Sequence, residues 1–225
     1  YVSITDIIKV TVRATTYTEQ ASNAQRSIVS TSASDTSAGT GARTIKLIYL
    51  TSTGTGPFTE TVTLNGTTAV DTVATDICFI ERMEVVTAGS GGVNAGTINL
   101  KAATAGGGAT IWSIAIGDNQ TFGAHHYIPT SKTAFITGMS IGHNGTTVGS
   151  GGLFTINAHP IGVANSVDKQ ISDFLRLYGQ SSTITRIWPT ALEVAGPAIV
   201  TAYVFAESAA DVIYRAAIDF YEQDT

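Results

Sequence analysis

The chain has 225 residues, which is enough for one large all-β domain or two small ones. Charged residues make up 13% of the chain, about half of their usual share in soluble domains, so uncharged polar residues and glycine must cover much of the surface. The net charge of −5 and the scattered lysines and arginines argue against nucleic-acid binding. No apolar run approaches the ~20 residues of a membrane-spanning helix, and the single cysteine excludes an intrachain disulfide.

The first 41 residues differ in composition from the rest. Residues 1–13, "YVSITDIIKVTVR", alternate like a strand, and residues 14–41 are rich in serine, threonine and alanine. Such a segment has little apolar surface to bury, so we predict an extended N-terminal arm or long loop within residues 1–41. Residues 42–225 contain no convincing linker, and we predict that they form a single domain.

From residue 42 onward, apolar and polar residues alternate as they do in half-buried strands. In "ARTIKLIYL", Ile45, Leu47 and Tyr49 share one face. In "TETVTLN", the threonines take one face and Val62 and Leu64 the other. Threonine suits such strands because its branched Cβ fits the pleat while its hydroxyl stays hydrated. The pattern continues in "GTINLKAA", "KTAFITGMSI", "GGLFTINAH", "STITRIW", "AIVTAYVF" and "DVIYRAAIDFY".

Turn signals separate these strands at a spacing of roughly ten residues, which is typical of an antiparallel β-sandwich or barrel. The strongest signal is Asn65-Gly66, which predicts a hairpin with a type I′ turn. Other glycine-rich breaks include "GTGP", "GSGG" and "AGGGAT". The segment "ISDFLRLY", residues 171–178, fits either a short helix or a strand.

Four stretches together resemble structural proteins of tailed bacteriophages and of some large viruses of aquatic microbes: "SASDTSAGTGARTIKLIYL", "TETVTLNGTTAVDTVATDICFIERMEVVTAGSGG", "GDNQTFGAHHYIPTSKTAFITG" and "VIYRAAIDFYEQ". The resemblance covers roughly residues 30–225. It implies a β-sandwich of jelly-roll type that is part of the virion, as a head decoration or cement protein or as a fibre component. The family brings no catalytic residues. It also implies a homotrimer.

Four histidines are the candidate metal ligands: His125, His126, His143 and His159. His125 and His126 are adjacent and point to opposite faces of a strand, so they cannot both ligate one ion without a bulge. His143 and His159 can approach one of them only if their strands are neighbours, and zinc would still need a fourth ligand. We therefore predict local hydrogen bonds for these side chains, with no metal and no cofactor.

Two pairs of carboxylates are the candidates for a glycosidase, which needs two such groups across a cleft. Glu81 and Glu84 fall on opposite faces of an extended strand, and Arg82 lies beside Glu84, which indicates ion pairing on the surface. Asp168 and Asp173 lie in "NSVDKQISDFLRLY", where they are explained as turn caps. We predict that neither pair is catalytic.

The remaining reactive and aromatic side chains also have structural explanations. Cys78 lies in the apolar strand "ICFIERMEVV", which predicts a buried thiol. No nucleophilic serine motif occurs in a credible context, and "AGGGAT" lacks the lysine and helix of a phosphate loop. Trp112, Trp188 and Tyr127 could stack on sugars, but packing in a core or an interface is the favoured interpretation.

The sequence therefore favours a non-enzymatic virion protein that decorates the capsid and clamps its shell. The expected partners are other copies of the chain and the major capsid protein, with no nucleic acid, membrane or small-molecule substrate. Low charge favours this role because few ions need desolvation when large faces become buried between subunits. The alternative is a tail fibre or spike module that binds a host receptor or glycan, and a hydrolase is the third class.

Overall fold

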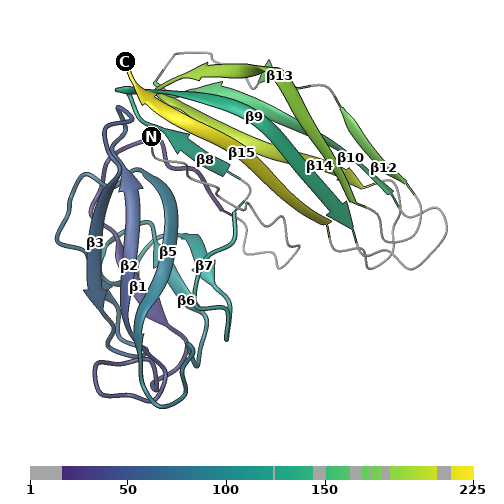
Figure 1. Cartoon of the computed structure of the whole chain (residues 1–225). Coiled ribbons are helices and arrows are strands. Elements are labelled where there is room, and N and C mark those ends of the chain that lie inside the picture. Colours follow the sequence, from purple (N-terminus) through teal and green to yellow (C-terminus); the bar gives the residue numbers. More distant parts are fainter. Residues whose placement is uncertain are drawn as a thin grey trace. The chain divides into compact units, whose positions relative to one another are not determined.

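The computed structural model describes residues 17–123, 125–143, 151–162, 169–172, 174–178, 183–206 and 214–225. Over these ranges the chain forms fifteen strands in four antiparallel sheets, and the single helical element is a 3₁₀ turn, η1 (Thr104–Gly106) (Figure 1). The prediction of an all-β, antiparallel fold is confirmed. In the described ranges no helix is long and apolar enough to cross a membrane.

Contacts divide the chain into two compact units, with the boundary between Phe122 and Gly123. We call the described residues up to Phe122 the N-terminal unit and those from Gly123 onward the C-terminal unit. This division differs from the predicted one, which places the boundary between residues 41 and 42. The connection "GDNQTFGAHHY" has the composition of an ordinary turn between strands, so the sequence gives no sign that a new unit begins there.

The N-terminal unit consists of two sheets around one hydrophobic core. One sheet has the order β4 (Val70–Asp71), β1 (Ser27–Ser30), β6 (Ile98–Lys101) and β7 (Thr110–Ile114), and the other has the order β3 (Phe58–Thr63), β2 (Ala42–Leu50) and β5 (Phe79–Ala88). Side chains from both sheets meet in a single buried cluster, which includes Ile28, Leu47 and Trp112.

The predicted alternation in β2 and β3 is confirmed. Ile45, Leu47 and Tyr49 are buried in the core. In β3 the threonines are exposed while Val62 is buried, and Leu64 just beyond the strand is buried as well. Because side chains of a strand alternate between faces, this burial follows directly from the period-2 pattern of the sequence.

Residues 17–41 differ from the extended arm that the sequence predicts. Residues 27–30 form β1, which lies between β4 and β6 inside a sheet, and Ile28 is fully buried. Composition is misleading here because β1 contributes a single side chain, Ile28, to the core. Hydrogen bonds of Arg26 and Asp35 hold the rest of the segment in place. Residues 1–16, including the predicted first strand, lie outside the described residues.

The predicted hairpin at Asn65-Gly66 is wrong. A type I′ turn needs positive φ at both central residues, but of these two only Gly66 has it, with φ of 61°. The flanking strands do not pair with each other: β3 pairs with β2, and β4 pairs with β1. The turn therefore carries the chain from one sheet of the unit to the other, where Gly66 N–H donates to the Asp35 carbonyl at 2.7 Å.

The C-terminal unit also consists of two sheets around one core. The first has the order β11 (Lys169–Gln170), β10 (Gly151–Pro160), β14 (Ala198–Ala206) and β8 (His125–Ile128), with β12 (Leu175–Tyr178) also paired to β10. The second has the order β13 (Thr183–Ala195), β9 (Lys132–His143) and β15 (Tyr214–Asp224). Buried side chains of both sheets form one cluster, which includes Ile136, Phe154 and Ile218.

These sheets bear on two interpretations of the sequence, the conformation of residues 171–178 and the jelly-roll connectivity. The segment left open between helix and strand contains a strand, β12. A jelly roll has eight strands in two sheets with Greek-key connections, and the strand orders of the described residues do not show that connectivity in either unit.

Candidate functional site

A buried carboxylate holds the serine- and glycine-rich segment of the N-terminal unit in place. Asp35 is fully buried. Its Oδ1 accepts the N–H groups of Ala42 and Ala95 at 2.7 and 2.8 Å, and its Oδ2 accepts the N–H of Gly96 at 2.8 Å and the hydroxyl of Ser30 at 2.6 Å. Four donors satisfy the carboxylate, so it joins the loop after β1 to the loop before β6.

Glycine is required beside this carboxylate. A Cβ atom on Gly41 would lie 2.1 Å from Asp35 Oδ1, and a Cβ atom on Gly96 would lie 2.6 Å from the backbone nitrogen of Ser32. No side chain fits at such distances. Gly41 and Gly96 are therefore needed for close backbone packing around Asp35.

A buried guanidinium performs a similar role on the other side of β1. Arg26 is 3% exposed and donates to the carbonyls of Ile77 at 3.0 Å, Ala102 at 2.7 Å and Ser22 at 2.9 Å. Burial lowers the pKa of Arg26 from its ordinary value, with nearby groups partly opposing the shift. These three acceptors are neutral backbone carbonyls, and Nη1 also donates to the side-chain oxygen of Gln20 at 3.4 Å, so the charge holds segments of the chain together.

Cys78 is a free, buried thiol, as the sequence predicts. Its Sγ lies 3.1 Å from the carbonyl oxygen of Gln20, to which it donates. Burial raises the pKa of Cys78 to about 11, with Arg26 acting weakly in the other direction. Because the thiolate is the reactive form, this cysteine is poorly suited to nucleophilic or metal chemistry at neutral pH.

The histidine side chains that the structure describes do not gather into a metal site. His125 and His126 point to opposite faces of β8, as predicted: His125 contacts Tyr127 edge-on, whereas His126 packs on Phe220, with ring centroids 4.6 Å apart. His159 lies on β10, opposite Ile199 of β14. The side chain of His143 is outside the described residues. Within the described part of the chain, no group of three or more metal-ligating side chains is present.

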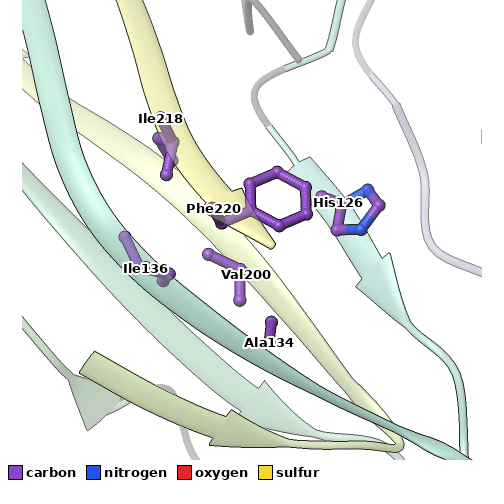
Figure 2. A pocket seen from close by; sticks show the side chains of 6 residues that line it. All are labelled: His126, Ala134, Ile136, Val200, Ile218 and Phe220. Carbon is purple, nitrogen blue, oxygen red and sulfur yellow. The ribbon is translucent and has the colours of Figure 1, made fainter. Parts of the chain in front are cut away.

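His126 instead joins the two sheets of the C-terminal unit. Its Nε2 lies 2.9 Å from Oε1 of Glu222 on β15, and both side chains are 16% exposed. Figure 2 shows the His126 ring beside Phe220, at the border of a small cavity. The other lining side chains are Ala134, Ile136, Val200 and Ile218.

The cavity is too small and too apolar for a substrate. It has room for about one water molecule. His126 is the single polar side chain among those lining it, and its Nε2 already bonds Glu222. A water molecule there would find few partners, so the site has the character of a packing defect in the core.

In the first carboxylate pair, Glu84 forms ion pairs near the surface, as the sequence predicts. Glu84 binds the ammonium of Lys46, and its Oε2 lies 3.2 Å from Nη2 of Arg82. Glu81 falls in the bulge between the Tyr49–Ile80 and Ile48–Arg82 register pairs. Asp168 and Asp173 lie outside the described residues.

The aromatic candidates are packing residues in the described structure. Trp112 is 1% exposed and Tyr127 is 2% exposed. Trp188 is partly buried and packs against the core of the C-terminal unit. Trp112 and Tyr127 are thus too deeply buried to offer a ring face to a sugar, in agreement with the packing interpretation.

The clearest surface feature is the outer edge of β13, by which we mean the side of residues 183–195 that faces away from β9. Among the described residues β13 pairs with β9 alone. Most of its thirteen side chains are exposed, including Ile187 at 71% and Ile184 at 41%. A long edge strand with exposed apolar side chains is suited to pairing with another strand.

No protein-family model, curated protein or solved structure matches this chain. The resemblance to viral structural proteins therefore stays a prediction.

The sequence alone did not indicate the three groups that hold the fold together: Asp35, Arg26 and Glu222. A partial signal exists for Asp35, since a lone carboxylate among serines and glycines has many backbone N–H groups within reach. Arg26 and Glu222 resemble ordinary surface charges in the sequence, because the partners Ile77 and Ala102 of Arg26, and His126 of Glu222, lie far away along the chain.

Proposed function

We propose that this chain is a non-enzymatic structural protein of a virion, which decorates the capsid surface and clamps the shell. The observation that supports it most is the character of the exposed surface. Large apolar side chains are exposed in both units: Val73 at 87%, Ile187 at 71%, Ile116 at 63% and Val86 at 52%. Exposed apolar side chains on a weakly charged protein favour burial against other subunits.

The outer face of the β3-β2-β5 sheet adds to this support. Register pairs place Thr63, Thr44 and Thr87 in one row across the three strands, and the hydroxyls of Thr44 and Thr87 lie 2.6 Å apart. Hydroxyl groups give hydrogen bonds without the cost of desolvating an ion. Such a face suits a contact with a neighbouring protein subunit.

The proposed partners are the major capsid protein and further copies of the chain, in a homotrimer as the resemblance implies. Nucleic acid, membrane, cofactor and small-molecule substrate have no part in this proposal. The jelly-roll connectivity also comes from the resemblance, and the proposal does not depend on it.

The location of the chain in virus particles tests the proposal. Gold-labelled antibodies against the chain should bind over the head of particles of the virus that encodes it. Quantitative mass spectrometry should give a copy number comparable to that of the major capsid protein. A few copies confined to a vertex or the tail would contradict capsid decoration and would support the fibre or spike module instead.

The proposed clamp by an N-terminal arm needs a different truncation from the one that the sequence suggests. Deletion up to residue 41 would remove β1 and Asp35 and would damage the N-terminal unit itself. Deletion of residues 1–16 leaves both in place. If this shorter truncation binds capsids as tightly as the whole chain, the arm has no role in clamping.

A further inference from the structure

The two edges of the β13-β9-β15 sheet differ in their protection against pairing. Strand β15 carries Asp219, Glu222 and Asp224 within its last six residues, and Asp224 binds the ammonium of Lys132 at 2.5 Å. Charges on an edge strand discourage the addition of another strand. The thirteen residues of β13, "TITRIWPTALEVA", contain two charges, Arg186 and Glu193.

These two charges are arranged so that β13 is complementary to itself. Arg186 precedes the middle of the strand and Glu193 follows it. If two β13 strands pair antiparallel, each arginine lies level with the glutamate of the other copy. Parallel pairing in register would bring like charges level with each other, which is unfavourable. Antiparallel self-pairing is also the arrangement that a two-fold axis produces.

A bulge marks the position of that axis. The register with β9 shifts between Ile187 and Leu192, which pair with Gly138 and Ile136. Residues 188–191 therefore interrupt regular pairing, and Pro189 among them has no N–H to donate. If the two-fold axis passes through the bulge, Pro189, which has no N–H group, lies where regular pairing is already interrupted. Residues 184–187 of one copy can then pair with residues 192–195 of the other.

We propose that two copies of this chain join the outer edges of their β13 strands, antiparallel, about a two-fold axis at the bulge. The three-stranded β13-β9-β15 sheets of the two copies become one continuous sheet across the contact. Ile187 of each copy is covered by the other. This two-fold contact goes beyond the proposed decoration of a capsid and does not depend on it. In a trimeric protein it links one trimer to the next.

Cysteine cross-linking tests the axis directly. With Arg186 level with Glu193, exposed Ile184 lies opposite exposed Ala195 of the other copy, so the double variant I184C/A195C should form disulfides between the two copies. Cross-strand neighbours have Cα atoms about 4.5–5.5 Å apart, within the range of a disulfide. T61C is the matched control, an exposed threonine of the N-terminal unit. The native Cys78 is buried and does not interfere. Under mild oxidation I184C/A195C should give a covalent dimer, and T61C should not.

The oligomeric state gives a second readout. We expect the whole chain to self-associate in multi-angle light scattering, and Ile187→Lys to weaken that association at least tenfold, since the contact would then bury a charged group opposite Leu192 of the other copy in place of an apolar side chain. Val73→Lys is the control for a new lysine at an exposed apolar position. A monomeric wild-type chain, a trimer that I184C/A195C fails to cross-link, or equal effects of the two lysine variants would each overturn the proposal. If Ile187→Lys does not fold, the cross-link decides.

Discussion

Asp35 offers the sharpest test of how the N-terminal unit is held together. Asp35→Asn keeps the shape of the side chain but replaces one oxygen with an NH₂ group. If the amide oxygen takes the place of Oδ1, it keeps the N–H groups of Ala42 and Ala95. The N–H of Gly96 then faces another donor and loses its acceptor.

The expected loss of stability follows from these bonds. A buried N–H without an acceptor costs about 1–3 kcal/mol. The two retained bonds lose their charge assistance, at about 1 kcal/mol each. Removal of the buried charge recovers part of its desolvation cost, so we expect a net loss of about 3 kcal/mol. That is a large part of the ~5–15 kcal/mol by which a domain is stable.

The two tryptophans allow each unit to be followed separately, since Trp112 lies in the N-terminal unit and Trp188 in the C-terminal unit. In a Trp188→Phe background, Trp112 fluorescence reports urea unfolding of the N-terminal unit. With a slope of ~1–3 kcal/mol/M, Asp35→Asn should lower the midpoint by roughly 1–3 M. The control is Asp71→Asn, an exposed carboxylate that accepts one N–H, from Ala105. Equal shifts in the two variants would refute the reasoning.

Four further predictions concern other polar groups. Burial raises the pKa of Cys78 to about 11, so at pH 8 a thiol reagent should react with the folded chain at least ~100-fold more slowly than with the urea-unfolded chain; similar rates would contradict the burial. The same shift makes the unfolded chain lose the thiol proton first, so the stability of the N-terminal unit should be intact below pH 9 and decline as the pH rises toward about 11, with a smaller decline in Cys78→Ala. Arg26→Met leaves the carbonyls of Ile77 and Ala102 without this donor and should cost about 2–4 kcal/mol in urea unfolding, whereas a loss below ~1 kcal/mol would show that other donors replace it. His126→Ala removes the bond to Glu222 between two sheets and should lower the midpoint of the C-terminal unit, followed by Trp188 in a Trp112→Phe background, while leaving the N-terminal unit unchanged.

The strands of this protein could be predicted from sequence because their signal is local. Alternation in "ARTIKLIYL" places Ile45, Leu47 and Tyr49 on one face whatever the rest of the chain does. The opposite faces of His125 and His126 follow from the same geometry. Burial of Cys78 was predictable for a related reason, since it lies in an apolar run of the sequence, directly before β5.

The tertiary arrangement could not be predicted because its signals lie far apart along the chain. Asp35 accepts the N–H groups of Ala95 and Gly96, which lie 60 and 61 positions further along the chain. The composition of the segment around Asp35 contains no trace of these distant bonds, so the segment looks unstructured. Asn65-Gly66 has the local preference for a hairpin, yet its neighbours find partners in two different sheets. Alternation likewise predicts that "STITRIW" is a strand but cannot show that this strand lies at the edge of a sheet.

The use of charge explains why so few ions remain to cover the surface. Arg26 and Asp35 are buried and bind backbone groups. Glu60 accepts the N–H groups of Val73 and Ala74 at 2.6 and 3.0 Å. The chain has only 12 basic and 17 acidic residues. Charged side chains that bind backbone groups of loops are therefore not available to cover the surface. The loops become well ordered while the exposed sheets keep threonine and apolar side chains, and both effects lower the free-energy cost of packing one subunit against another.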